Sequence, residues 1–306
     1  MYTLAIAFPN IRRWRVPLSR DQLMLLMAAT NEIFLGIDIY LAHSISGTII
    51  PNEWIPIIFG PIAGLLLLVA GLIALRKRSL ATVLATFVFL ISIAVGLLGA
   101  YFHITRAILP AGPPGERFTV NLLVWAPPVL GPLTFSLVGL IGISAAWVER
   151  PPDSGDLILL WGRHLPFPYS KTRGLILLIG LGSLATVISS VLDHARTNFE
   201  NPWLWVPTAV GIFGTVIAMA FAAEDLPRRG DVLTFIVAMI LMILVGLLGS
   251  YLHIRQNLTS QGVIVGERFL RGAPFLAPLL FADMGSLGLL ALLDPSESVV
   301  RDSPPE

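Results

Sequence analysis

Four of the five histidines in this sequence fall at matching places in two similar stretches of the chain. His103 and His253 each close the pattern Val-Gly-Leu-Leu-Gly-small-Tyr-apolar-His, and His43 and His194 each stand near the end of an earlier apolar segment. An imidazole can ligate a haem iron or a transition metal, hydrogen-bond a quinone, or anchor a helix at the polar edge of a membrane. The repeated histidine pair therefore predicts one candidate site in each half of the chain.

Glycines precede two of these histidines on the same helix face. Gly96, Gly99 and His103 have the spacing i, i+3, i+7, and the second half repeats this spacing up to His253. Small residues in membrane helices usually serve close helix packing. They would equally leave room for a flat macrocycle whose iron the histidine ligates. The sequence leaves both interpretations open.

The candidate cofactor is haem b, or a quinone that is hydrogen-bonded by histidine and tyrosine. Tyr40 adjoins His43, and Arg106 and Arg255 closely follow the other two histidines. Those arginines would bind haem propionates or another carboxylate, or they would anchor the helices among lipid headgroups. An alternative is a single metal site in which all four imidazoles meet at an axis between the halves: His43, His103, His194 and His253.

Two carboxylates, Glu32 and Asp283, fall near the middle of apolar segments. Ionisable groups at that depth are costly and usually mark a functional interior. The matching positions in the other half are Ser183 and Leu137, so the halves differ where polarity matters. The two acids predict a proton or substrate path; the alternative is a pair of protonated carboxyls hydrogen-bonded within the bundle.

Membrane-spanning helices must position these residues. The 306 residues are 55% hydrophobic and only 13% charged, against roughly 25% charged in soluble domains. A span needs about 20 mostly apolar residues. The sequence predicts an all-α integral membrane protein with about eight spans, at roughly 22–44, 54–75, 80–104, 123–147, 173–195, 203–223, 232–254 and 274–293. At about 1.5 Å per residue, all four histidines lie near the same edge of the hydrocarbon layer.

Several kinds of chemistry are excluded by what the sequence lacks. It has no cysteine, which excludes disulfides, thiolate-held iron–sulfur clusters, thioether-attached haem and a thiol nucleophile. It has no Walker motif, nucleophile elbow or His-Glu-x-x-His sequence, so ATPases and hydrolases of those types are not expected. The net charge of +1 gives no reason to expect a nucleic-acid partner.

The sequence also predicts two tandem copies of one four-helix unit. Gly115-Glu-Arg-Phe recurs at Gly266, and a series of Pro, Phe and Gly residues recurs at a constant offset, from 128–142 to 274–288. We expect an N-terminal repeat over 1–149, a cytoplasmic linker over 150–172, and a C-terminal repeat with a short cytoplasmic tail over 173–306. Because four spans is an even number, the copies should be parallel and related by a pseudo-twofold axis along the membrane normal.

The placement of lysine and arginine predicts the orientation. With the N-terminus inside, the inner segments hold 14 of the 20 basic residues and the outer segments hold six. Positive charge favours the cytoplasmic side in this way. The inner set includes Arg12, Arg13, Arg15 and Arg301. Both termini are therefore expected in the cytoplasm, and the histidines near the outer face.

Eight spans in two duplicated four-helix units, with a histidine pair in each, resembles the layout of haem A synthases. The eight-helix quinone-binding subunits of the polysulfide reductase type are similar in span count. The sequence has no Glu-x-x-His-Arg motif and no outer cysteine pair, and its histidines fall on odd-numbered spans. The resemblance is therefore one of architecture, and no site residue is carried over.

The resulting expectation is a membrane redox subunit that binds haem b or a quinone near the outer face. It would pass electrons to or from an extracytoplasmic partner, beside other membrane subunits in the lipid bilayer. Two further classes remain open. One is a transporter or metal-handling protein whose path runs through Glu32 and Asp283, and the other is a structural membrane anchor.

Overall fold

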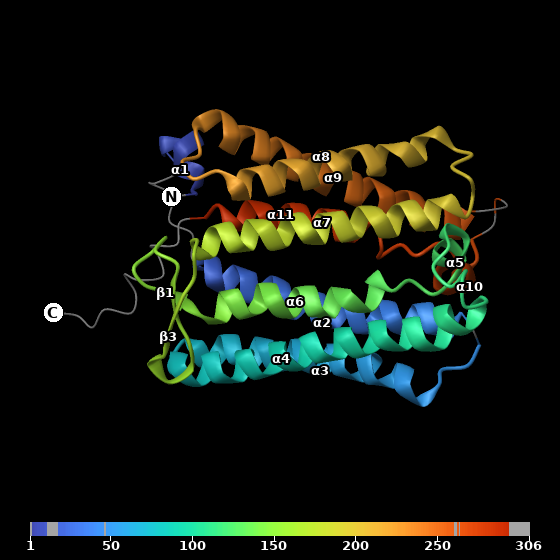
Figure 1. Cartoon of the computed structure of the whole chain (residues 1–306), viewed down its shortest axis with the longest axis horizontal. Coiled ribbons are helices and arrows are strands. Elements are labelled where there is room, and N and C mark those ends of the chain that lie inside the picture. The colour runs from blue at the N-terminus through green and yellow to red at the C-terminus, as the bar shows by residue number, and fades with distance from the viewer. Residues whose placement is uncertain (1, 11–17, 46, 260–261, 263, 294–306) are drawn as a thin grey trace.

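The long helices lie side by side along one axis (Figure 1). The computed structural model describes residues 2–10, 18–45, 47–259, 262 and 264–293, without the side chains of 269–271. Arg12, Arg13, Arg15 and Arg301, which contribute to the predicted orientation, lie outside the described residues. The long helices are α2 (Arg20–Ser44), α3 (Trp54–Ala74), α4 (Arg78–Phe102), α6 (Leu130–Ala146), α7 (Lys171–Ala195), α8 (Trp205–Ala223), α9 (Arg229–Thr259) and α11 (Leu279–Ala291).

Short helices lie at the two ends of this bundle. Helix α1 (Leu4–Ala7) lies at the end that carries the N-terminus, and α5 (Val120–Trp125) and α10 (Gly266–Arg271) lie at the opposite end (Figure 1). Single turns link the long helices: η2 (Pro51–Glu53), the π-helical η3 (His103–Ile108), η4 (Leu109–Ala111), η5 (Leu160–Gly162) and η6 (Pro202–Leu204).

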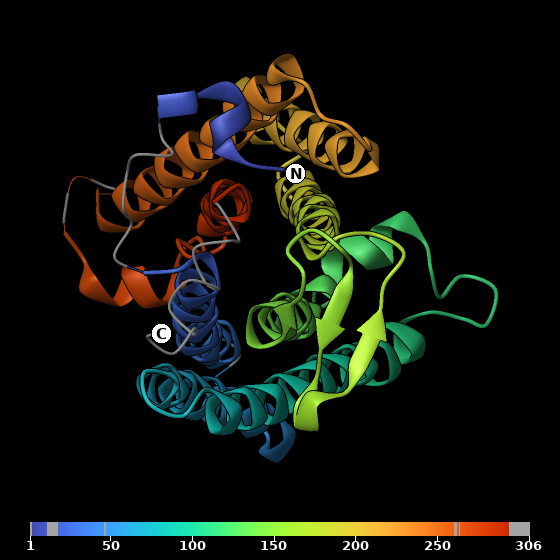
Figure 2. The same cartoon turned by 90° about the vertical axis from the view of Figure 1, so that its left-hand side faces the viewer.

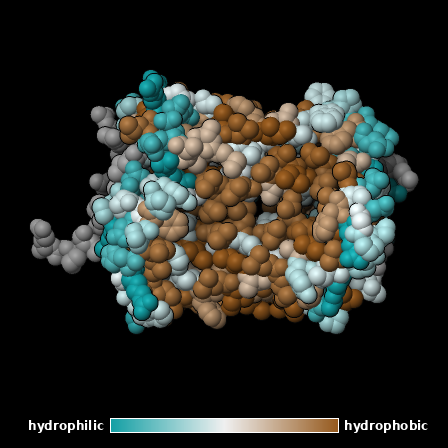
Figure 3. Space-filling view, in the orientation of Figure 1, coloured by the Kyte–Doolittle hydropathy of each residue, from teal (hydrophilic) through white to brown (hydrophobic). Residues whose placement is uncertain are grey.

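The outer surface is that of a multi-pass membrane protein. Six helical segments of the described chain are long and apolar enough to cross a bilayer. Hydrophobic side chains cover the middle of the face in Figure 3, and hydrophilic ones gather at its two ends. Exposed tryptophans mark the end that carries α5 and α10, as expected where aromatic rings lie among headgroups: Trp54, Trp125, Trp203 and Trp205.

The two remaining apolar helices are shorter than the sequence predicts. Helices α6 and α11 have 17 and 13 residues, about 26 and 20 Å at 1.5 Å per residue. The predicted span 123–147 is broken between α5 and α6, where Pro127 and Pro128 stand, and the predicted span 274–293 becomes helical only after Pro278. Proline lacks an N–H, and it also disfavours the helical conformation of the residue before it.

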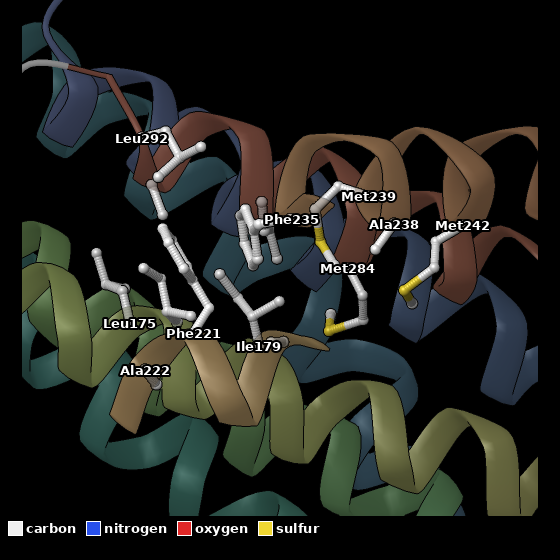
Figure 4. Close-up of a cluster of buried hydrophobic side chains, with 14 of the residues drawn as sticks. Leu175, Ile179, Phe221, Ala222, Phe235, Ala238, Met239, Met242, Met284 and Leu292 are labelled. Atoms are coloured by element: carbon white, nitrogen blue, oxygen red, sulfur yellow. The ribbon is translucent and has the colours of Figure 1, made fainter. Parts of the chain in front are cut away.

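The helices form two apolar cores: one lies within the first half, and the other fills the second half and includes Met24, Ile141 and Ala145 of the first. Figure 4 shows the core of the second half, where Phe221 and Phe235 stack at 4.7 Å between ring centres. The N-terminal segment covers the end of this core: the Tyr2 ring meets Phe221 edge-on at 5.1 Å, and Leu4 donates its N–H to the Leu292 carbonyl. Residues 2–10 therefore pack against the C-terminal half, although they begin the N-terminal one.

The connection between α6 and α7 contains a small antiparallel sheet that the sequence pattern does not predict. Its strands are β1 (Val148–Glu149), β2 (Asp156–Ile158) and β3 (His164–Pro166), in the order β1-β2-β3. The buried Glu149 carboxylate holds the linker in place, since it accepts N–H groups from Asp153, Gly155 and Lys171.

The two halves meet through paired contacts at the end that carries the N-terminus. Arg20 and Lys171 are the first residues of α2 and α7. Arg20 donates to the Thr172 hydroxyl at 2.7 Å, and Lys171 donates to both carboxylate oxygens of Asp21 at 2.8 and 2.9 Å. Each first residue thus binds the second residue of the opposite helix.

The same reciprocal pattern of contacts continues along the boundary between the halves. Helix α6 contacts α7 while α11 contacts α2, and α5 contacts α7 while α10 contacts α2. Viewed end-on, α2, α6, α7 and α11 surround the centre, with α3, α4, α8 and α9 outside them (Figure 2).

Candidate functional site

The structure brings His43 and His103 together at the end that carries α5 and α10. Their rings are 6.3 Å apart between centres and nearly perpendicular, at 87°. His43 directs Nδ1 to the Ile39 carbonyl at 3.1 Å, and His103 directs Nδ1 to the Pro128 carbonyl at 2.8 Å. Because a carbonyl only accepts hydrogen bonds, each Nδ1 carries the hydrogen, and each Nε2 keeps a lone pair that can bind a metal.

A proline explains why a histidine is needed at position 103. In a helix the N–H of residue 132 would bind the carbonyl of residue 128, but Pro132 has no N–H. His103 supplies the missing donor to Pro128. The second half repeats the arrangement, with His253 Nδ1 at 2.9 Å from the Pro274 carbonyl and Pro278 four residues later. Both histidines therefore have a structural role whether or not they bind a cofactor.

The second histidine pair is arranged differently from the first. His194 meets the Phe199 ring edge-on at 6.0 Å, and Phe199 in turn stacks on Trp205 at 4.4 Å. The Nδ1 atom of His194 is buried and has no hydrogen-bond partner among the described residues. His194 therefore lacks the carbonyl bond that fixes the other three rings.

The glycines beside His103 serve helix packing, so the interpretation that they make room for a macrocycle is wrong. A β-carbon on Gly96 would collide with Ser136, and one on Gly99 would collide with the Pro132 ring. The second half packs α9 on α11 in the same way, through Gly246 and Gly249 against Pro278. The glycine faces are filled by the last helix of each half.

The other predicted cofactor residues do not surround the histidine pair. Tyr40 is 45% exposed and shares the outer face of α2 with Phe34 and Ile37. The Arg106 guanidinium lies over the Phe102 ring at 4.7 Å. It also donates to the side-chain oxygen of Asn52 at 2.7 and 3.1 Å. Arg255 is exposed at the same end.

One site residue was missed by the sequence analysis. Glu53 Oε1 lies 3.9 Å from His43 Nε2, and Glu53 Oε2 accepts the N–H of Ile50, which holds the carboxylate at the start of η2. Aligning the repeats around Pro51 and Pro202 would have found it, because Leu204 stands where the first half has Glu53. The second half has no acid at that position, and the acid beside its histidines is Asp193, which interacts with both His194 and His253.

Glu32 lies in the core of the first half, fully buried. The Ser92 hydroxyl is 2.5 Å from Glu32 Oε1 and 2.9 Å from the Phe135 carbonyl, while Glu32 Oε2 has no partner among the described residues. A hydroxyl has one hydrogen, so Ser92 can donate to only one of these oxygens. Both bonds form at once if Glu32 itself is protonated and donates to Ser92.

Asp283 lies on the boundary between the halves instead. Both of its carboxylate oxygens accept from the Asn31 amide, at 3.0 and 2.9 Å, which joins α11 to α2. Asn31 and Glu32 are neighbours in α2 but point to different sides of it. The structure therefore places Glu32 and Asp283 in two separate environments and does not join them in one path.

The single four-histidine metal site is not formed. Within the described part of the chain, no group of three or more His, Cys, Asp or Glu side chains is arranged to hold a metal ion. The histidines fall into one pair per half instead.

No protein-family model, curated protein or solved structure matches this chain.

Proposed function

We propose that this chain is an eight-span membrane redox protein that holds one haem b between His43 and His103. Its two four-helix units are parallel repeats related by a pseudo-twofold axis along the membrane normal. Both termini lie in the cytoplasm, so the haem lies near the outer face, where it exchanges electrons with an extracytoplasmic partner.

The reciprocal contacts between the halves support the repeat. In a twofold interface, residue i of one unit contacts residue j of the other, and j contacts i. The pairs Arg20–Thr172 and Lys171–Asp21 follow this rule, since 20 matches 171 and 21 matches 172 in the repeat. The short helices α6 and α11 complete the fourth span of each unit together with the non-helical segments before them.

Single cysteines will test the orientation, and the cysteine-free sequence makes each variant unambiguous. A β-carbon at Gly115, Gly266 or Gly230 meets no atom within 4 Å, so a cysteine fits at all three positions. We expect Gly115→Cys and Gly266→Cys to react with an impermeant maleimide in intact cells, and Gly230→Cys to react only after permeabilisation. The reverse pattern would invert the orientation, and labelling of Gly115 and Gly266 from opposite sides would refute parallel repeats.

The geometry of the first histidine pair is the observation that carries the redox proposal. An iron held between two Nε2 atoms by bonds of about 2 Å, with roughly 1 Å more from each nitrogen to its ring centre, separates the ring centres by about 6 Å. The observed separation is 6.3 Å. Hydrogen bonds from Nδ1 to backbone carbonyls also orient metal-ligating histidines in general. His43 and His103 would hold the haem, which would supply one-electron transfer.

One contact of the present arrangement opposes ligation. The Glu53 carboxylate lies 3.9 Å from His43 Nε2, on the side where a metal would bind. Binding of the macrocycle therefore requires Glu53 to turn away, and it requires space outside the glycine face of α4, which α6 fills. The second pair is assigned no haem, because the His194 ring lies against Phe199 and its Nδ1 is not fixed by a carbonyl.

Absorption spectroscopy tests the proposal directly. The protein purified from a host that makes haem should show a Soret band, split visible bands on reduction, and one haem b per chain by the pyridine haemochrome assay. Absence of the Soret band would refute the haem. A quinone in the organic extract of haem-free protein would replace it with the quinone alternative.

A second candidate, proton-coupled transport, is favoured by the fully buried Glu32 alone. It predicts that Glu32→Gln abolishes transport by reconstituted protein without altering any haem spectrum.

A further inference from the structure

A groove separates the start of α4 from the linker hairpin at the end that carries the N-terminus. It has a volume of about 760 Å³. Its walls are the first turns of α4, the end of α6 and the tip between β2 and β3, and its lining residues include Arg78, Ser79, Arg150 and Trp161. Among the described residues that line it, none is acidic, and Arg78 also lies 3.9 Å from the Asp21 carboxylate, which is not part of the lining.

The charge of the groove matches an anionic headgroup. Arg78 and Arg150 approach it from two different elements, the first residue of α4 and the residue after β1. The exposed side chains of Arg76 and Lys77 precede α4 and add to the local positive charge. Basic residues at a membrane surface attract anionic lipids.

The groove continues into the lipid-facing surface of α4. Leu80 and Val83 line the groove and are exposed, and Phe87 and Leu90 are exposed farther along the helix. The spacing 80, 83, 87, 90 places all four on one helix face. An acyl chain can therefore lie along α4 while its headgroup stays in the groove, which a soluble phosphate compound cannot do.

The hairpin tip carries an exposed tryptophan in an unusual backbone conformation. Trp161 is 85% exposed, and Trp161 and Gly162 have φ angles of 58° and 70°, so the turn requires positive φ at both central residues. Asn, Asp and Gly usually fill such positions. Tryptophan is instead the residue that favours the headgroup layer of a membrane. Its place at the rim of the groove indicates that the tip lies among lipid headgroups.

We propose that this groove binds one anionic phospholipid of the surrounding leaflet, with the headgroup phosphate between Arg78 and Arg150 and an acyl chain along Leu80, Val83, Phe87 and Leu90. The bound lipid would join α4 to the linker between the two halves. This site lies at the opposite end of the helices from His43 and His103, and it does not depend on the haem.

Native mass spectrometry of the detergent-purified, delipidated full chain tests the site. Phosphatidylglycerol and phosphatidylcholine with the same acyl chains are titrated in parallel. We expect one phosphatidylglycerol to bind at least about tenfold more tightly than phosphatidylcholine, and Arg78→Gln/Arg150→Gln to remove most of that preference. The matched control Arg228→Gln/Arg229→Gln, at the same end but outside the groove, should retain it. Equal binding of the two lipids, or an unchanged preference in the groove variant, would overturn the proposal.

Two further measurements make the test independent of that variant. Glycerol 3-phosphate should not displace the lipid, because it lacks the acyl chain; displacement at equal concentration would reject a lipid as the occupant. Brominated phosphatidylglycerol should quench tryptophan fluorescence in the wild-type protein more strongly than in Trp161→Phe. Equal quenching in the two proteins would place the lipid elsewhere, even if Arg78→Gln/Arg150→Gln does not fold.

Discussion

Lys171→Met should destabilise the protein by about 3 kcal/mol, the cost of leaving one partner of a buried ion pair without the other. The Lys171 ammonium is buried and fully bonded, to both oxygens of Asp21 and to the Trp147 carbonyl. Methionine fills a similar volume but offers no donor. Asp21 would keep Arg20 and Arg78, whose nearest nitrogens lie 3.7 and 3.9 Å from its carboxylate. The midpoint of unfolding by SDS, followed by circular dichroism, measures the change.

The matched double variant Asp21→Asn/Lys171→Met separates the ion pair from the packing. It removes the Asp21 charge together with its Lys171 partner but also takes the carboxylate away from Arg20 and Arg78, so part of the lost stability should return. Arg229→Met at the exposed start of α9 is the control and should change the stability by less than about 0.5 kcal/mol. A Lys171→Met protein as stable as that control would show that the paired contacts do not hold the halves together.

The sequence predicted the places of the helices because each is a long apolar run whose charged residues, apart from a few such as Glu32 and Asp283, lie near its ends. The sequence overestimated the lengths of α6 and α11 for a local reason. Pro127, Pro128 and Pro274 lie in apolar stretches, and hydropathy does not register the missing N–H. It also missed the linker sheet, because strands of two or three residues are too short for an alternating pattern to be recognised.

The candidate site was predictable in composition but not in geometry. The repeat pairs His43 with His103, whose rings lie 6.3 Å apart between centres, and Glu32 is fully buried. No spacing rule could show that the Pro132 ring would fill the space beside Gly99, since that contact joins residues on different helices. The Lys171–Asp21 pair spans 150 residues, and only an alignment of the two helix starts, Ser19-Arg20-Asp21 with Ser170-Lys171-Thr172, would have indicated it.

His103→Ala should abolish the Soret absorbance entirely, because it removes one of the two proposed iron ligands. The same change also leaves the Pro128 carbonyl without its donor, so the protein could lose haem simply through local unfolding. A loss of absorbance in this variant is therefore expected from both a ligand and a purely structural histidine.

His103→Gln, combined where needed with Pro132→Ala, separates the two roles. A glutamine amide can donate to the Pro128 carbonyl, and alanine at 132 restores the N–H that would bind the same oxygen within the helix. Both changes should recover the unfolding midpoint, yet neither provides an imidazole, so the Soret band should stay absent. His253→Ala removes the equivalent donor to Pro274 in the half that is assigned no haem, and it should leave the spectrum intact. His164→Ala, whose ring bonds Asp156 in the linker, should do the same. The contrary result is that His103→Gln regains both its stability and the full Soret band. In that case the role of His103 is only to donate a hydrogen bond to the Pro128 carbonyl, and it does not ligate the iron.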